Sequence, residues 1–226
     1  MTRKLLKQII GLATAVLLTG CASSPLIAKK EAFPNMYDEQ PVSIFVAPPI
    51  NQTTAAEATE YLTVTLPQPL SFHGFYTLPI EVTTELLHQA GVQDGAQLAD
   101  VPPEYFAQFG ADAVLYITIK KWDTSYYVVG GNVSVGLSYE LKSAKTGERL
   151  WNYNQTVVVD TTDGSSNLLV KLVATAIKTA AQDYLPVARK ANAIAMSTLP
   201  NGKYSPMFGK DGEMKVVNKQ ALDADN

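Results

Sequence analysis

The sequence predicts a single α/β domain, in which helices pack on a mixed sheet that contains a long antiparallel hairpin. Residues 133–142 alternate strictly between apolar and polar side chains, which is typical of a strand with one buried face. Residues 113–119 are apolar on both faces, as in a strand that is covered from two sides. Residues 169–184 repeat apolar side chains at helical spacing. Such elements bury their apolar faces only against one another, so we expect one layered core.

Before the buried strand, each predicted element is bounded by a proline, a glycine or a residue that can cap a helix. In chain order we first expect a central strand over 42–47 and a helix over 55–66, which is capped by Asn51 or Thr53-Thr54 and interrupted by Pro67 and Pro69. A short strand over 75–78 should follow. Two further helices should run from Thr83 or Thr84 to Ala90 and from Pro102-Pro103 to about Gly110. The residues between the last two helices should be loop.

The strand over 113–119 should lie in the middle of the sheet because both of its faces are apolar. The chain then turns within residues 143–148, so residues 151–159 should pair with residues 133–142 as a long hairpin. The helix over 169–184 should lie across the sheet and end at Pro186. From Pro200 the tail has turn residues, and its last dozen residues should be loose.

The amino terminus has the order of a secretory signal. Arg3, Lys4 and Lys7 precede an apolar run over 9–18, which at about ten residues is too short to span a bilayer. The segment Leu18-Thr19-Gly20-Cys21 is similar to the lipobox of bacterial lipoproteins. That similarity implies cleavage between Gly20 and Cys21 and attachment of a diacylglycerol to Cys21. The alternative is that Cys21 is an incidental thiol near an ordinary cleavage site.

The mature chain divides into three parts after the signal over residues 1–20. Residues 21–41 are rich in Ser, Pro, Lys and Glu without an apolar period, which predicts a lipidated amino terminus and tether. Residues 42–199 form the α/β periplasmic domain, and residues 200–226 form a C-terminal tail. Residue 22 is Ala rather than Asp, which by similarity to the sorting rule of Gram-negative lipoproteins indicates the periplasmic face of the outer membrane.

Charge and cysteine content exclude two classes of protein. Removal of residues 1–20 leaves 15 basic residues against 21 acidic ones, a formal charge of −6, and no basic cluster, so a nucleic-acid binder is excluded. Cys21 is the single cysteine, so the fold cannot depend on internal disulfides. We expect the membrane, through the lipid anchor, and other proteins as partners.

The residues for catalysis are sparse. The chain has two histidines, His73 and His88, and it lacks a Gly-x-Ser-x-Gly turn, a metal-ligand motif and a phosphate loop. We therefore assign no catalytic, cofactor-binding or metal-binding residue and expect no cofactor. A cell-wall hydrolase remains an alternative, for which the candidate carboxylates are Glu57, Glu60, Glu81 and Glu85.

Aromatic side chains gather before Gly130-Gly131. Trp122, Tyr126 and Tyr127 are candidates for a protein interface, since aromatic residues are enriched in interfaces. The alternative is that these side chains pack on a neighbouring helix.

Short segments along the mature chain together resemble one family. They are Phe33-Pro34, Tyr37, Gln40-Pro41-Val-Ser-Ile, Pro48-Pro49-Ile-Asn51, Glu60-Tyr61, Pro69-Leu70, Gly74-Phe75-Tyr76, Leu78-Pro79, Gly110-Ala-Asp-Ala-Val114, Thr146-Gly147, Leu150-Trp151 and Leu199-Pro200, with Gly202, Pro206 and Phe208-Gly209-Lys210-Asp211 in the tail. Their order resembles the outer-membrane lipoprotein family of unknown function whose best-known member is a neisserial genome-derived antigen.

The resemblance implies an α/β fold similar to the TolB N-terminal domain and to curli-type secretion lipoproteins. It also implies a curli-pore-like lipoprotein as partner and association into a homodimer. With the anchor and the sparse catalytic groups, this predicts a non-enzymatic binding or assembly module, an accessory of a secretion or surface-assembly complex. A second hypothesis is activation of a peptidoglycan synthase, which is less favoured because a tether of about twenty residues spans at most roughly 70 Å.

Overall fold

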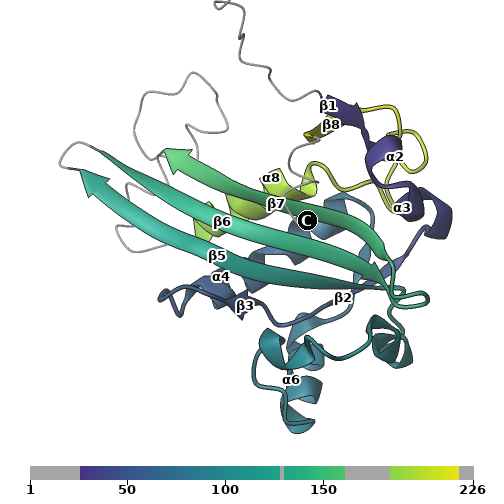
Figure 1. Ribbon diagram of the computed structural model, residues 1–226, viewed down its shortest axis with the longest axis horizontal. Coiled ribbons are helices and arrows are strands. Elements are labelled where there is room, and N and C mark those ends of the chain that lie inside the picture. The colour runs from purple at the N-terminus through teal and green to yellow at the C-terminus, as the bar shows by residue number, and fades with distance from the viewer. Residues whose placement is uncertain (1–25, 128–129, 161–183, 219–226) are drawn as a thin grey trace, which may run out of the picture.

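A computed structural model describes residues 26–127, 130–160 and 184–218 (Figure 1). Its main sheet has the strand order β4-β2-β5-β6-β7, and β3 pairs with Thr118 and Ile119 in the middle of β5. These strands are β2 (Ser43–Val46), β3 (Ile50–Asn51), β4 (Tyr76–Thr77), β5 (Ala113–Tyr127), β6 (Gly130–Ser143) and β7 (Arg149–Asp160). The pairs β2–β4, β2–β5 and β3–β5 are parallel, whereas the pairs β5–β6 and β6–β7 are antiparallel. The predicted mixed sheet is therefore confirmed.

Helices pack on both faces of the sheet. On one face lie α4 (Ala58–Thr65), α5 (Pro67–Phe72) and α8 (Leu185–Met196). On the other face lie α6 (Ile80–Gln89) and the 3₁₀ helices η1 (Gly95–Leu98) and η2 (Pro103–Phe109), which enclose a second apolar cluster around Phe45 and Phe106. The strand β5 lies between the two clusters, and this confirms its predicted place in the middle of the sheet.

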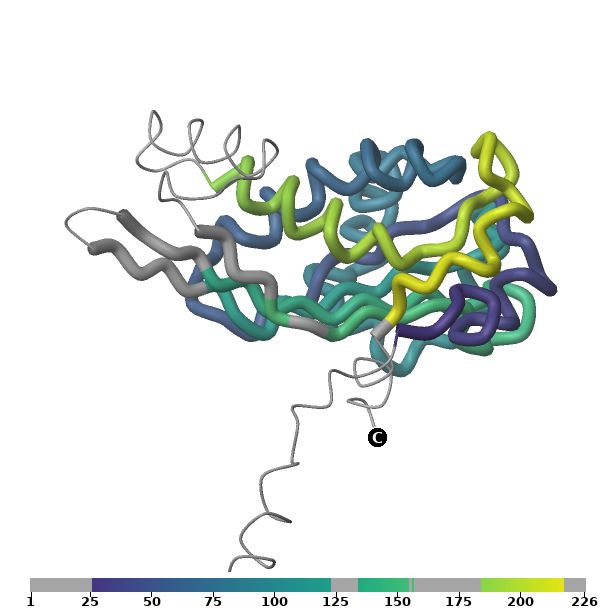
Figure 2. The backbone as a smooth tube through the Cα atoms, turned by 90° about the horizontal axis from the view of Figure 1, so that it is seen from above, coloured from purple at the N-terminus to yellow at the C-terminus, as the bar shows by residue number. Residues whose placement is uncertain are grey.

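The predicted hairpin is formed by β6 and β7, and the helices of the described residues cover mainly one of its faces. Tyr139, Leu141 and Trp151 point to the side of α8 and are buried. Figure 2 shows α8 along this face, while the opposite face carries no described helix beyond η2. We call the part of this second side that β6 and β7 form the open face, because on β5 the same side is covered by η2 around Val114.

A buried amide fixes α8 on the sheet. Asn192 is fully buried, and its Nδ2 donates to the carbonyl oxygen of Leu62 at 2.9 Å and to Oγ1 of Thr65 at 2.7 Å. Tyr139 of β6 donates its hydroxyl to Oδ1 of the same side chain. Because every polar atom of Asn192 is paired, this polar group orients α8 against α4 and β6 without an unpaired buried donor.

Several helix boundaries differ from the sequence prediction, and prolines explain them. Pro67 opens α5 instead of only interrupting α4, and Pro186 lies in the first turn of α8. Proline is tolerated there because the amides of the first turn have no partner within the helix. The helix α6 starts at Ile80, so the Thr83 hydroxyl bonds back to the Ile80 carbonyl and caps nothing. The predicted loop contains η1. The helix predicted over 169–184 lies outside the described residues except for Tyr184.

The predicted tether is wrong from Leu26 onward. Residues 26–39 form β1 (Leu26–Ala28), α2 (Lys29–Ala32) and α3 (Pro34–Glu39). Phe33 and Met36 are buried in the main cluster, where the Phe33 ring stands edge-on to that of Trp151 at 6.5 Å between centroids. The segment folds because its few apolar residues, spaced too irregularly for a visible period, each find a site on the sheet.

The tail is also folded as far as Asn218. The strand β8 (Lys215–Asn218) pairs antiparallel with β1 in a second, two-stranded sheet, so the prediction of a loose end is wrong for residues 215–218. Before it, residues 200–209 pack on the chain after α5. The Gly202 amide donates to the His73 carbonyl oxygen at 2.7 Å, and the Tyr204 amide donates to that of Gly74 at 3.1 Å. No helix in the described part of the chain is both long and apolar enough to cross a membrane.

The contact at Gly74 gives a first prediction. Gly74 has φ +80°, and a Cβ there would lie 2.1 Å from the Ser205 amide nitrogen. Gly91 has φ +90° with no atom within 4 Å of such a Cβ, so Gly91→Ala measures the backbone strain alone. We expect Gly91→Ala to lower the free energy of unfolding by about 1 kcal/mol. Gly74→Ala should lower it by at least about 3 kcal/mol because the tail backbone must move.

Denaturant unfolding of the two variants measures the difference. Equal losses of unfolding free energy in Gly74→Ala and Gly91→Ala would show that the tail backbone is not in close contact with Gly74.

Candidate functional site

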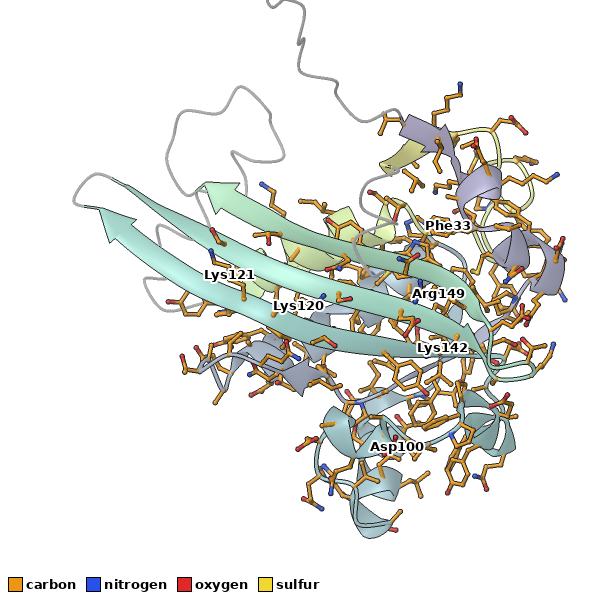
Figure 3. All side chains as sticks on the ribbon, in the orientation of Figure 1. Phe33, Asp100, Lys120, Lys121, Lys142 and Arg149 are labelled. Atoms are coloured by element: carbon orange, nitrogen blue, oxygen red, sulfur yellow. The ribbon has the colours of Figure 1, made fainter. Side chains whose placement is uncertain are left out.

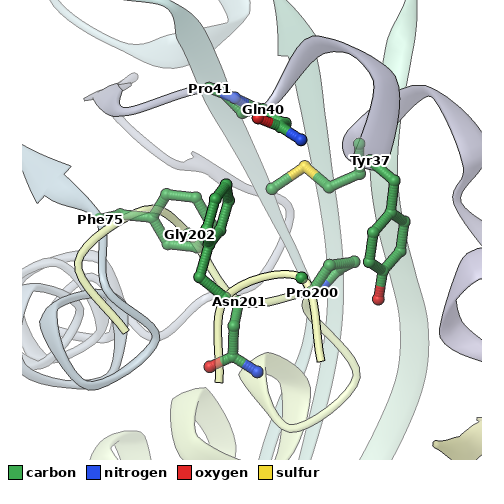
Figure 4. A pocket seen from close by; sticks show the side chains of 10 residues that line it. Tyr37, Gln40, Pro41, Phe75, Pro200, Asn201 and Gly202 are labelled. Atoms are coloured by element: carbon green, nitrogen blue, oxygen red, sulfur yellow. The ribbon is translucent and has the colours of Figure 1, made fainter. Parts of the chain in front are cut away.

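Three segments that are far apart in the sequence meet at one place on the surface. They are the end of α3, the start of β4 and the tail, and they line a narrow cleft (Figure 4). The lining residues are Met36, Tyr37, Gln40, Pro41, Phe75, Pro200, Asn201, Gly202, Phe208 and Gly209. The cavity volume of the cleft is about 20 Å³. Since small-molecule sites enclose several hundred Å³, this cleft admits water rather than a substrate.

A buried ion pair lies beside this cleft. Nζ of Lys29 lies 3.5 Å from Oδ2 of Asp211 and donates to the carbonyl oxygen of Leu199 at 2.8 Å. The two side chains are 2% and 0% exposed. We call this pair, which joins the first described helix to the tail, the Lys29–Asp211 clasp.

Neighbouring groups complete the bonding of the carboxylate. Asn201 donates to Oδ2 of Asp211 from its amide at 2.9 Å and from Nδ2 at 2.7 Å, and the Tyr37 hydroxyl donates to Oδ1 at 3.1 Å. Burial acts to raise the pKa of Asp211, but the Asn201 hydrogen bonds, the Lys29 charge and the Tyr37 hydrogen bond outweigh it and hold the pKa below its usual value. Burial lowers the pKa of Lys29, and Asp211 opposes that change. Desolvation and the nearby carboxylate raise the pKa of Tyr37.

Gln40 is strained at the same cleft. Its φ of 49° is the one positive value of a non-glycine residue among the described residues. It ends α3 in the left-handed conformation, with its amide bonded to the Met36 carbonyl oxygen at 3.1 Å. Glycine or asparagine usually takes this position, so the contacts of the cleft must hold the glutamine backbone in place.

The two histidines do not form a catalytic site. His73 ends α5, and its Nδ1 is buried without a hydrogen-bond partner. Burial, and then the charge of Lys29, lower its pKa to about 4, so its ring is neutral at neutral pH. His88 lies on the exposed side of the last turn of α6, in the layer on the other face of the sheet.

The candidate carboxylates and metal ligands are likewise dispersed. Glu57 and Glu60 belong to the start of α4, whereas Glu81 and Glu85 lie on α6, on the opposite side of the sheet. Within the described ranges no three His, Cys, Asp or Glu side chains are placed to hold a metal ion.

The structure separates the predicted interface residues. Trp122 is 7% exposed, belongs to the main core and stands edge-on to Tyr184 at 6.3 Å between centroids. Trp122 therefore packs in the core and is not available to a partner. Tyr126 and Tyr127 lie at the end of β5, opposite Gly131 and Gly130, and their side chains fall outside the described residues. For these two tyrosines the interface stays a prediction.

The residues of the clasp could not be predicted from the sequence. Lys29 and Asp211 are 182 positions apart, and Lys29 stands in a polar stretch that looks solvated. The one signal in the sequence is that Asp211 and Tyr37 belong to segments of the family resemblance. Gly20 and Cys21 lie outside the described residues, so lipidation at Cys21 also stays a prediction.

The lowered pKa of His73 gives a prediction for the pH dependence of stability. Between pH 6.5 and about 4 the unfolded chain binds a proton at His73 that the folded chain does not bind. Stability should therefore fall as the pH falls through this range, by at most about 1.4 kcal/mol per pH unit and by less for a partly exposed ring. The His73→Gln variant should lose this slope, whereas His88→Gln should keep it.

Urea unfolding between pH 7 and 4 checks this expectation. An unchanged slope in His73→Gln would assign the acid sensitivity to other groups. Loss of stability through Asp211 and Asp112, whose pKa values are lowered, belongs to a still more acidic range.

Comparison with known proteins places this chain in a family. The model of the family described as "Putative lipoprotein GNA1162-like" matches residues 32–207. The "Putative lipoprotein NMB1124/NMB1162" of Neisseria meningitidis serogroup B is 31% identical over 170 residues, which cover 75% of this chain and 78% of that protein. The crystal structure of lipoprotein GNA1162 from Neisseria meningitidis is 32% identical with a TM-score of 0.52, over 63% of this chain and 100% of that one.

A more distant match is the PelC dodecamer from Paraburkholderia phytofirmans, with 16% identity and a TM-score of 0.43 over 80% of this chain and 96% of that one. The family match covers the residues that line the cleft except Phe208 and Gly209, and it agrees with the resemblance of the separate segments. The chain belongs to the GNA1162-like lipoprotein family.

Proposed function

We propose that the protein is an outer-membrane lipoprotein that is anchored at Cys21 and acts on the periplasmic face as a non-enzymatic binding or assembly module. It serves as an accessory of a secretion or surface-assembly complex. Its partners are a curli-pore-like lipoprotein and a second copy of the chain.

The short distance between the anchor and the folded body carries this proposal. The strand β1 begins at Leu26, five residues after Cys21, so the body lies at most about 18 Å from the lipidated residue. The family is described as one of lipoproteins. A body held this close to the bilayer is suited to partners that are themselves embedded in or bound to the same membrane.

The geometry of the cleft supports a role without catalysis. The cleft is too narrow for a substrate, His73 and His88 lie in different layers, and the clasp is a paired, buried structure rather than a reactive group. The cell-wall hydrolase is therefore less favoured. Activation of a peptidoglycan synthase is also less favoured. A tether of about twenty residues would span about 70 Å, but residues 26–39 are folded, so the free chain spans only about 18 Å.

The predicted contact with the partner is the end of the β5–β6 hairpin near Tyr127. A photo-crosslinking amino acid at position 127 should capture a protein of the outer membrane in intact cells. The same amino acid at exposed Tyr105, on η2, should capture none. The Ala22→Asp change should leave the chain labelled by palmitate but abolish capture at position 127, because the anchor then keeps the body on the inner membrane.

Two results would contradict the proposal. One is wild-type protein that takes up no palmitate or takes it up equally after Cys21→Ser. The other is capture at position 127 that is unchanged by Ala22→Asp, since the partner would then not belong to the outer membrane.

A further inference from the structure

An apolar groove, which we call the α6 groove, opens beside the edge strand β4. It lies between α6 and the end of η2, and its cavity volume of about 390 Å³ is enough to take up a large side chain. None of the residues that line it is acidic, basic or a histidine, so the groove is suited to an apolar group rather than to acid-base chemistry. Its lining includes Tyr76, Leu78, Val82, Leu86 and Phe109.

Carboxylates follow the rim of the α6 groove. On α6, Val82 and Leu86 are four positions apart, and so are Glu81 and Glu85. Because side chains four positions apart lie on one side of a helix, α6 carries an apolar row and an acidic row next to each other. All four side chains are exposed. A partner of the groove should therefore combine an apolar side chain with a basic one.

The chain separates its charges on a larger scale. Residues 31–119 contain Asp and Glu but no Lys or Arg, whereas residues 184–210 contain Lys and Arg but no Asp or Glu. Figure 3 shows Asp100 among the helices around α6 and the labelled lysines on the strands. Lys145 follows β6 near this end of the sheet, but it is paired with Asp112 at 3.7 Å. The surroundings of the α6 groove are therefore acidic, and the complementary charge lies in the last part of the same chain.

The tail offers a surface of the complementary kind. Phe72 is 75% exposed and Tyr204 is 67% exposed, the highest values among the large apolar side chains of the described residues, and Met207 is also exposed. The tail lies beside Phe72 because its backbone bonds to the two residues that follow Phe72. Lys203 is exposed next to Tyr204, and the nearest carboxylate in the sequence, Asp211, is buried in the clasp. We call Phe72, Lys203, Tyr204 and Met207 the tail patch.

The two surfaces lie on opposite faces of the same edge of the sheet. Phe75 belongs to the core on the side of α8 and lines the cleft with the tail. Tyr76, the next residue, lines the α6 groove on the other face. Among the described strands none pairs with β4 on its outer side, so this edge is available to a second molecule.

We propose that the α6 groove binds the tail patch of a second copy of the chain. This step rests on the proposed association between copies and assigns its surfaces. Tyr204 of each copy enters the groove of the other, and Lys203 lies against Glu81 and Glu85. A two-fold axis in the plane of the sheet places the tail of each copy on the same side as the groove of the other. Both contacts then form at once, and the dimer is closed.

Analytical ultracentrifugation of the Cys21→Ser chain without residues 1–20 tests this interface. The chain should dimerise reversibly, and added salt should raise the dissociation constant. Tyr204→Ala should raise it by about tenfold or more, because a large side chain that fills a groove contributes much of the binding energy. Lys203→Glu, which we call the tail variant, should also raise it by about tenfold or more, because like charges then meet at two contacts in each dimer.

A charge exchange between the two surfaces gives the most specific result. The groove variant, Glu81→Lys with Glu85→Lys, should dimerise as poorly as the tail variant. An equal mixture of the two variants should recover nearly the original dissociation constant, because each groove then meets a tail of opposite charge. The matched control is Glu57→Lys with Glu60→Lys, which makes the same change of charge at exposed positions of α4 and should leave dimerisation unchanged. Circular dichroism verifies that each variant is folded.

A chain that stays monomeric would overturn the inference. Equal weakening by the control would do so as well, because association would then depend on net charge rather than on these surfaces. If both variants dimerise poorly but their mixture does not recover, the groove and the tail patch do not meet each other and the inference is wrong. Since the chain in this assay carries no lipid, its result is independent of lipidation at Cys21 and of the membrane to which the protein is sent.

Discussion

The buried Lys29–Asp211 clasp is the interaction on which the arrangement of the molecule depends. Breaking a buried ion pair by removing one partner costs about 3–5 kcal/mol, because the remaining charge stays without water or a counter-charge. The clasp, with the Leu199 carbonyl oxygen and Asn201, therefore forces the first described helix and the tail to stay together. Around it, β1 pairs with β8 and the strained Gln40 is held at the cleft. The chain next to the proposed anchor is thus attached firmly to the body.

The sequence predicted the elements whose signals are local, and it missed those that depend on distant partners. Strict alternation over 133–142 was sufficient for the β6–β7 hairpin, and the doubly apolar run over 113–119 was sufficient for the middle strand. Lys29 lies in the segment that was predicted to be a tether, because the groups that pair with its side chain come 170 and 182 residues later. Two prolines hid helix starts, since Pro67 opens α5 and Pro186 lies in the first turn of α8, a helix that was not predicted.

The candidate site shows the same division. The lipobox-like segment around Cys21 is a local motif, so lipidation could be predicted from it, whereas the clasp and the open face exist only after folding. Lys120, Lys142 and Arg149 are separate in the sequence, and the register of three antiparallel strands brings them to one face. Trp122 was a reasonable interface candidate by composition, but the register of β5 turns it toward the core and Tyr184. The proposed function therefore depends on where the protein is held rather than on a reactive group.

Amide hydrogen exchange in the Lys29→Met, Asp211→Asn and doubly substituted chains tests the role of the clasp most directly. Amide hydrogen exchange should be faster over 26–39 and 211–218 in each single variant, and the β6–β7 hairpin should keep its protection. The double variant should recover part of the lost protection, because it leaves no unpaired buried charge. Unchanged exchange in β1 and β8 after loss of either charged group would contradict the account, since the two segments would then be held together by other contacts.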